Sequence, residues 1–135
     1  MSILPWSDML SVGVKAIDRQ HQTLIDILNQ FGEQVDKRAG DWEESVTLSR
    51  LVAYTETHFA FEEALMRKAG YPGMEDHVEE HRQLFQQVAD IMTRVTSGEK
   101  PDPQELMIFL RDWLSTHILV TDKALGAALN GRGIT

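Results

Sequence analysis

Apolar and polar residues follow one another along this chain with the period of an α-helix, in four long stretches. From Ile17, apolar residues or histidines recur in steps of three and four through Val35. Comparable stripes run over residues 48–65, 77–95 and 106–117. Steps of three and four keep side chains on one face of a helix, so each stretch predicts a helix with one buried face.

Turn-forming residues separate these stretches at Gly40, at Gly70 and between Ser97 and Pro103. We therefore expect helices at about 17–39, 43–69, 74–96 and 103–126, after an N-terminal arm at about 1–16. Short connections favour antiparallel neighbours. The predicted fold class is all-α, an antiparallel up-down-up-down four-helix bundle that residues 1–135 form as a single domain. The arm is expected either to cover part of the bundle, with Trp6 as its anchor, or to be a flexible tail, and residues 126–135 are expected to fray.

Composition narrows the classes of partner. A formal charge of −8 argues against nucleic acid and anionic membrane surfaces, which would repel the chain. No apolar stretch is long enough to cross a bilayer and no leader-like segment begins the chain, so we expect a cytoplasmic protein without membrane insertion. The absence of cysteine means that any metal must be held by imidazole and carboxylate groups.

Polar residues interrupt the apolar stripes where leucine or isoleucine would be expected. Burying such groups costs several kcal/mol unless they are hydrogen-bonded, paired or bound to metal. His58 and Glu62 are four residues apart, as are His77 and His81, and a step of four turns only about 40° around a helix. Each pair therefore points in one direction, and His21 occupies an equivalent stripe position.

His117 and Asp122 differ, because a step of five turns Asp122 about 140° away on a regular helix. Either the last helix contains a π-like turn there, or Asp122 approaches from the flank. The predicted metal ligands are His21, His58, Glu62, His77, His81, His117 and Asp122. Seven ligands suit two octahedral ions that share carboxylates. Iron, manganese, zinc, copper and nickel all fit this ligand type, and iron also permits redox chemistry with dioxygen.

The motifs His58-Phe-Ala-Phe-Glu62, His77-Val-Glu-Glu-His81 and His117-Ile-Leu-Val-Thr-Asp122, after a lone His21, resemble the hemerythrin family over essentially the whole chain. The segments at residues 17–21 and 70–72 are similar to those of its single-domain bacterial members, the bacteriohemerythrins.

The resemblance implies reversible binding of dioxygen at a non-haem di-iron centre, for oxygen storage, transport or delivery, and not an enzyme. Two iron ions, cycling between Fe²⁺ and Fe³⁺, would share an oxo or hydroxo bridge. By the same resemblance, one ion takes His77, His81 and His117, the other takes His21 and His58, and Glu62 and Asp122 bridge both. For delivery, an oxygen-consuming enzyme would be the recipient.

Two other functions compete with a carrier. A di-iron oxidase or peroxidase of the ferritin-like kind typically uses Glu-x-x-His pairs and a carboxylate-rich shell, whereas this chain has steps of four and five histidines. An oxygen- or redox-sensing module would be expected beside a separate output domain, for which 135 residues leave no room. Glu63, Glu79 and Glu80 have stripe phases that point away from the site, so we expect a solvated face or pairing along the helix for them, and not metal ligation. The expected dry wall of the site consists of Leu24, Ile25, Phe59, Leu84, Trp113 and Leu114.

Overall fold

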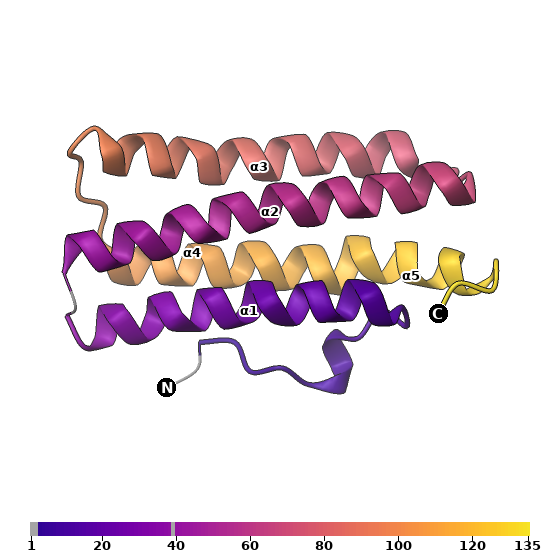
Figure 1. The fold of residues 1–135 in the computed structure, drawn as a ribbon, viewed down its shortest axis with the longest axis horizontal. Coiled ribbons are helices and arrows are strands. Elements are labelled where there is room, and N and C mark those ends of the chain that lie inside the picture. Colours follow the sequence, from indigo (N-terminus) through magenta and orange to yellow (C-terminus); the bar gives the residue numbers. More distant parts are fainter. Residues whose placement is uncertain (1–2, 39) are drawn as a thin grey trace.

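Four antiparallel helical rods form a bundle in the computed structural model, which describes residues 3–38 and 40–135 (Figure 1). The elements are a 3-10 turn at Asp8–Leu10, α1 at Lys15–Asp36, α2 at Asp41–Ala69, α3 at Met74–Thr96, α4 at Pro103–Thr116, a π-helical segment η2 at His117–Asp122, and α5 at Lys123–Asn130. No strand occurs within the described residues. The chain direction alternates from rod to rod, which confirms the predicted fold class.

Local chemistry sets most of the helix ends. Asp102 caps α4 by accepting a hydrogen bond from the backbone of Gln104, and Pro103 occupies the first turn, where its missing N–H costs nothing. Gly70 ends α2 in the left-handed conformation that favours glycine. The first helix ends at Asp36, because Arg38 adopts a positive φ of 51°. Residues 1–2 of the expected arm and residue 39, the expected end of this helix, lie outside the described residues.

The last rod is longer than the sequence indicated. Residues 126–130 do not fray, since α5 continues to Asn130 and Leu129 is fully buried. Gly126 makes this possible: a Cβ added there would lie 1.9 Å from the carbonyl oxygen of Val12, so only glycine lets the arm pass this closely. Asn130 donates a hydrogen bond to the carbonyl of Gly13 and thereby ties the end of the rod to the arm.

The arm lies along α1 and is part of the bundle (Figure 1). Asn29 accepts hydrogen bonds from the backbone N–H groups of Ile3 and Leu4, and it donates one to the carbonyl of Leu4. Trp6 is half-buried and packs against the core, as expected of an anchor. Val12 is buried at the other end of the arm.

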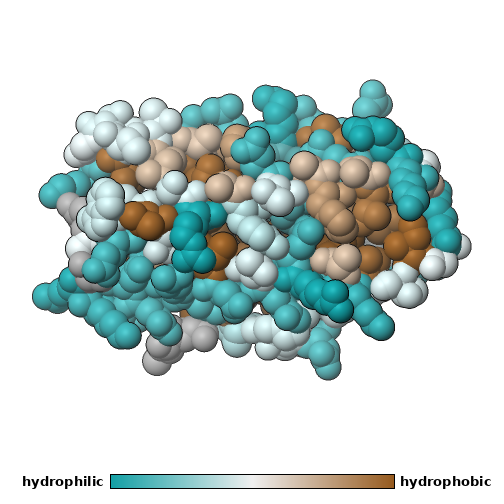
Figure 2. All heavy atoms as spheres, viewed as in Figure 1, coloured by the Kyte–Doolittle hydropathy of each residue, from teal (hydrophilic) through white to brown (hydrophobic). Residues whose placement is uncertain are grey.

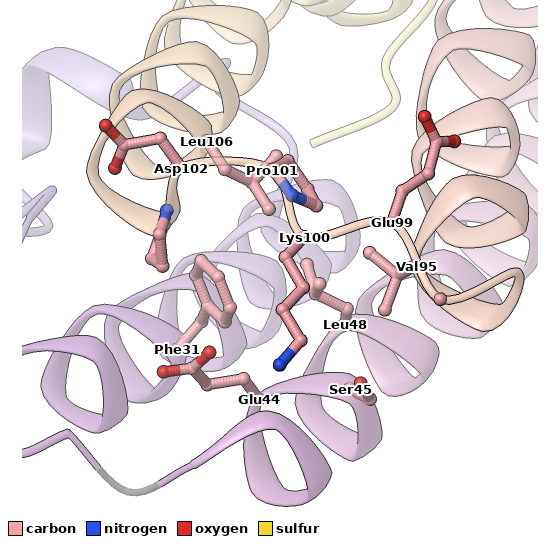
Figure 3. Close-up of a pocket in the computed structure, with 12 residues that line it drawn as sticks. Phe31, Glu44, Ser45, Leu48, Val95, Glu99, Lys100, Pro101, Asp102 and Leu106 are labelled. Atoms are coloured by element: carbon pink, nitrogen blue, oxygen red, sulfur yellow. The ribbon is translucent and has the colours of Figure 1, made fainter.

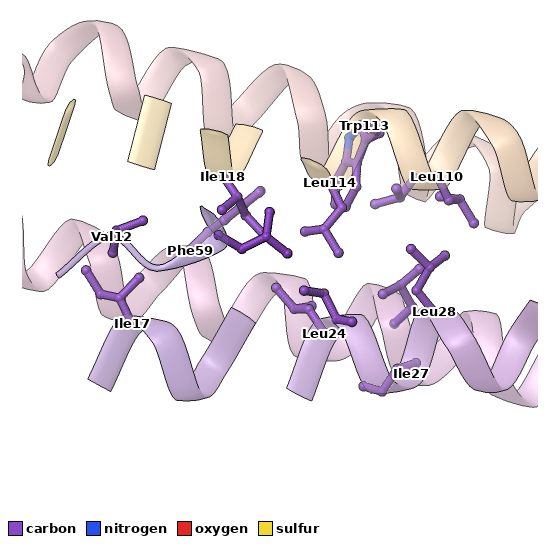
Figure 4. Close-up of a cluster of buried hydrophobic side chains, with 14 of the residues drawn as sticks. Val12, Ile17, Leu24, Ile27, Leu28, Phe59, Leu110, Trp113, Leu114 and Ile118 are labelled. Atoms are coloured by element: carbon purple, nitrogen blue, oxygen red, sulfur yellow. The ribbon is translucent and has the colours of Figure 1, made fainter. Parts of the chain in front are cut away.

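The apolar core lies chiefly between α1 and the last rod, where Leu110, Leu114 and Ile118 point toward Leu24 and Leu28 (Figure 4). Packing neighbours of α1 are α2 and α4, while α3 packs on α2. The buried residues of α3 are His77, His81 and Val88 only. This helix is therefore held by few fully buried apolar side chains.

The visible face of the molecule is largely polar, with apolar side chains gathered over the last turns of α2 and over α5 (Figure 2). None of the described helices combines the length and the apolar character that a bilayer crossing requires.

Candidate metal centre

The seven predicted ligands meet in the middle of the bundle, and each is at most 3% exposed. They are His21 on α1, His58 and Glu62 on α2, His77 and His81 on α3, and His117 and Asp122 on η2. Every rod therefore contributes at least one group.

A π-helical segment solves the spacing problem of the last two groups. The helix widens over His117–Asp122, so that five residues make little more than one turn. Of the two possibilities left open by the sequence, the π-like turn is the one observed. It places the His117 Nε2 and Asp122 Oδ1 atoms 3.2 Å apart on the same face of the rod.

Glu62 presents one oxygen to each side of the centre. Its Oε1 lies 2.9 Å from His81 Nε2 and 3.2 Å from His77 Nε2. Its Oε2 lies 3.2 Å from His58 Nε2. The carboxylate is thus placed between two sets of imidazoles.

The two oxygens of Asp122 likewise face different histidines. Its Oδ1 lies 3.2 Å from the Nε2 atoms of both His77 and His117, whereas its Oδ2 lies 2.8 Å from His21 Nε2. His21 Nε2 is in turn 3.1 Å from His58 Nε2. The seven residues therefore form two overlapping groups that share both carboxylates.

Among the residues that the structure describes, the donor atoms fall into two groups. One group, the three-histidine group, contains His77, His81 and His117 with the two carboxylates. The other, the two-histidine group, contains His21 and His58 with the same carboxylates. Within each group the donor atoms lie within 4.8 Å of one another.

These contacts have the form of a coordination site more than that of a hydrogen-bond network. Neighbouring ligands of an octahedral ion are about 3 Å apart when each lies about 2.1 Å from the metal, and most of the distances above are close to this. Both oxygens of Asp122, Oε2 of Glu62 and Nε2 of His117 are buried without a hydrogen bond of acceptable direction, despite their close neighbours. Their lone pairs point into shared space, which suits a cation held by nitrogen and oxygen donors.

Electrostatics also favour positive charge here. Burial lowers the pKa of the His77 imidazole, but hydrogen bonds and the charges of Asp122 and Glu62 outweigh burial and raise the pKa to about 9. The same balance raises the pKa values of His21 and His117. Burial likewise raises the pKa of the Glu62 carboxyl, yet its histidine contacts hold that pKa well below the ordinary value. The two carboxylates therefore favour a positive charge beside them, which a proton or a metal cation can supply.

His58 behaves differently, because burial lowers the pKa of its imidazole by more than Glu62 raises it. A neutral His58 leaves its Nε2 lone pair available to a metal ion.

Three side chains outside the centre contact the opposite ring nitrogens, Nδ1, of the histidines. Glu63 Oε2 lies 2.9 Å from His81 Nδ1, and Gln20 Oε1 lies 2.7 Å from His58 Nδ1. Glu80 Oε2 lies 3.5 Å from His117 Nδ1. Glu63 and Glu80 are outside both donor groups, and the sequence did not predict their contacts with histidine rings of other helices. Both carboxylates lie on helix faces that point away from the centre, but the outer nitrogens of the imidazole rings extend far enough to contact them.

Glu79 follows the expectation, since it is exposed and pairs with Arg82 one turn along α3. Gln20 was not singled out from the sequence. Its position directly before His21 gave no signal, because its partner is His58 on another helix.

An apolar wall surrounds the centre. Phe59 stacks on the His81 ring at a centroid distance of 3.9 Å and an interplanar angle of 7°. Of the expected wall residues, Leu24, Ile25, Phe59, Trp113 and Leu114 are buried, whereas Leu84 is half-buried. Figure 4 shows Leu24, Phe59 and Leu114 gathered around Ile118, next to His117 in the chain.

Comparison with known proteins identifies the family. A profile described as "Hemerythrin HHE cation binding domain" matches residues 12–129. The chain belongs to the hemerythrin family. This confirms the resemblance that the motifs indicated, and a cation-binding family agrees with the donor groups of the centre.

Individual members of the hemerythrin family are similar over almost the whole chain. A bacteriohemerythrin of Stenotrophomonas maltophilia is 37% identical over 92% of this chain and 80% of the relative. A bacteriohemerythrin of Methylococcus capsulatus is 32% identical over 96% of this chain and 99% of the relative. The crystal structure of a wild-type hemerythrin superposes with a TM-score of 0.86 at 32% identity, covering 95% of this chain and 98% of that one.

A surface pocket of about 330 Å³ lies elsewhere, where the α3–α4 connection meets the start of α2 (Figure 3). Phe31, Leu48 and Leu106 contribute apolar side chains to its lining, and Lys100 and Glu99 contribute charged ones. None of the seven candidate ligands lines it, so it is separate from the metal centre.

Proposed function

We propose that this protein binds dioxygen reversibly at a non-haem di-iron centre. The observation that carries the proposal is the pair of overlapping donor groups that share Glu62 and Asp122. Two groups with two shared carboxylates fit two ions held close together, and they do not fit a single ion. The similarity to bacteriohemerythrins supports the same conclusion.

The donor groups indicate how the protein would hold the ions. His77, His81 and His117 would bind one iron, and His21 and His58 would bind the other. Glu62 and Asp122 would each give one oxygen to either ion, alongside an oxo or hydroxo bridge. When bound, the iron pair supplies the electrons that dioxygen takes up on binding and returns on release.

The groups differ by one histidine, and this difference directs dioxygen. The two-histidine group supplies four protein donors against five in the three-histidine group. If both ions had the same coordination number, His21 and His58 would leave room for a small ligand on their side of the centre. Leu24, one turn from His21, and the buried Leu114 and Ile118 keep bulk water from that region.

The carboxylates also reduce the charge that the core must accommodate. Isolated ions are costly in an apolar interior, and Glu62 and Asp122 cancel part of the positive charge of two metal ions. Neutral imidazoles complete the donor set without adding charge.

The donor set favours binding over catalysis. Ferritin-like di-iron enzymes typically use Glu-x-x-His pairs at a step of three, whereas the pairs here have steps of four and five. On this proposal the protein stores, transports or delivers dioxygen and is not an enzyme.

Anaerobic reconstitution with Fe²⁺ tests the proposal. We expect two iron ions per chain and an absorption band that appears when dioxygen is admitted and disappears when it is removed. The cycle should repeat without loss of signal. Prompt conversion to a ferric protein that vacuum does not reverse would contradict a carrier function and favour an oxidase.

A further inference from the structure

The histidines of the centre differ in what their outer nitrogens contact. His81, in the three-histidine group, has its Nδ1 2.9 Å from a carboxylate oxygen of Glu63. His58, in the two-histidine group, has its Nδ1 2.7 Å from the amide oxygen of Gln20. The first acceptor carries a negative charge and the second is neutral.

The charge of the acceptor matters for metal binding. An acceptor at Nδ1 holds the proton on that nitrogen, which directs the Nε2 lone pair toward the centre. A carboxylate forms a stronger hydrogen bond than a neutral amide and makes the imidazole a better electron donor. Glu63 therefore strengthens His81 as a ligand more than Gln20 strengthens His58.

The remaining outer contacts have the same bias. A second carboxylate, Glu80, lies 3.5 Å from Nδ1 of His117 in the three-histidine group. In the two-histidine group, Nδ1 of His21 has no hydrogen-bond partner among the described residues. His77 and His117 lack one as well, so in the three-histidine group His81 alone hydrogen-bonds an outer acceptor, and Glu80 adds a nearby negative charge without a hydrogen bond.

Packing fixes the plane of the ring on which Glu63 acts. Phe59 stacks face to face on His81, which leaves rotation within the ring plane as the main freedom. The hydrogen bond from Nδ1 to Glu63 removes that freedom. Phe59 and Glu63 are both on α2, whereas His81 is on α3, so contacts from α2 orient a ligand that α3 carries.

We propose that Glu63 and Gln20 are positioning residues that make the two metal positions unequal, so that the first divalent cation enters the three-histidine group. This inference rests on the proposed function, because it requires two metal positions. The extra histidine of that group favours the same order, and the outer contacts widen the difference.

Exchanging the two acceptors tests the inference directly. Glu63→Gln replaces the carboxylate beside His81 with an amide of the same shape, and Gln20→Glu does the reverse beside His58. Zn²⁺ is a suitable probe, because it takes imidazole and carboxylate ligands and has no redox chemistry. Competition with a chromophoric chelator would give the two stepwise affinities of the metal-free protein.

We expect wild-type protein to bind two Zn²⁺ ions in separate steps. Glu63→Gln should weaken the tighter step by about 10- to 100-fold, and Gln20→Glu should tighten the weaker step. Exposed residues provide controls with the same change of net charge: Glu79→Gln on α3 and Gln22→Glu on α1 should alter neither step appreciably.

Histidine ¹⁵N spectra of the Zn²⁺-loaded protein separate positioning from simple stabilisation. The Nδ1 proton of His81 should resonate far downfield in the wild type and move upfield in Glu63→Gln, while the melting temperature of the metal-free protein stays within a few degrees. Loss of metal affinity together with loss of the metal-free fold would instead assign Glu63 a structural role and overturn the inference.

The inference and the function can fail separately. Two tight Zn²⁺ ions in the wild type, with identical affinities in Glu63→Gln and Glu79→Gln, would refute the positioning role and leave the proposed centre intact. Uptake of fewer than two ions by correctly folded wild-type protein would overturn both.

Discussion

The stability of this molecule depends on how its buried histidines are compensated. His21 and His58 are fully buried, with Nε2 atoms 3.1 Å apart and acidic oxygens close by. Such groups destabilise a core unless something compensates them. Here the compensation is mutual, since nitrogen and carboxylate donors surround common points that a cation can occupy.

Substitution of one ligand should have an effect that a neighbouring acid does not share. His77→Ala removes one of five donors from the three-histidine group, so its metal affinity should fall by more than about 100-fold. Glu79→Ala, two residues away on the exposed side of α3, should change metal content little and stability by less than about 0.5 kcal/mol. Metal analysis after dialysis measures both. Similar losses in the two variants would show that the ligand assignment is wrong.

At the scale of elements, the π-helical segment η2 sets the direction of Asp122. Five residues in η2 make little more than one turn. A step of five residues there therefore rotates a side chain about as far around the axis as a step of four in a regular helix. One residue fewer in this segment should therefore be tolerated better than one residue more.

Deletion and insertion should therefore have opposite outcomes. Without the exposed Val120, a regular helix places the carboxylate four residues after His117, still about 40° from it, so two ions should remain bound. An alanine inserted after Val120 turns Asp122 and the buried Leu125 by about 100°, so metal binding should be lost and the bundle strongly destabilised. Metal content and thermal unfolding would be compared for both variants. Equal loss in both would rule out this role of η2.

Periodicity was sufficient to predict the four rods and the five histidines and Glu62 that meet between them, because both depend on which face of a helix a residue occupies. Asp122 is out of phase on a regular helix and was indicated only by the resemblance of its motif. It was insufficient for contacts that depend on ring orientation. Glu63 lies beside a ligand in sequence and off the stripe, yet it reaches a ring on another helix. Backbone detail was also needed to choose between a π-turn and an approach from the flank. The last rod continues through Gly126 in close contact with the arm, and the path of the arm cannot be predicted from the hydrophobic periodicity.

At the scale of the whole molecule, the centre links stability to pH. With raised pKa values, His21, His77 and His117 bind protons more tightly in the folded chain than in the unfolded one. Their contribution to stability is complete below the ordinary pKa of 6.5 and is lost as pH rises through the folded values, about 9 for His77. His58 acts in the opposite sense, because its lowered pKa destabilises the fold as pH falls below 6.5.

Metal-free protein should therefore be most stable near neutral or mildly acidic pH. Its free energy of unfolding should decrease between pH 7 and 9.5, by on the order of 1 kcal/mol per pH unit for each proton involved. Below pH 4.5 it should decrease again, as unfolding lets Glu62 take up a proton. Urea denaturation of chelator-treated protein measures this profile. Metal-loaded protein serves as the control and should show no alkaline loss over this range. A metal-free profile that rises toward pH 9.5 would contradict the assigned shifts.

The sparse burial of apolar side chains on α3 makes the attachment of this helix depend on a cation at the centre. Two of its three buried residues are imidazoles of the centre, and Val88 alone is a buried hydrocarbon. Its other core-facing apolar side chains, such as Leu84, Phe85 and Ile91, are only half-buried, so a metal-free chain should open first along this helix. Proteases act on segments that have detached, so the metal-free protein should be cleaved sooner than the metal-loaded protein.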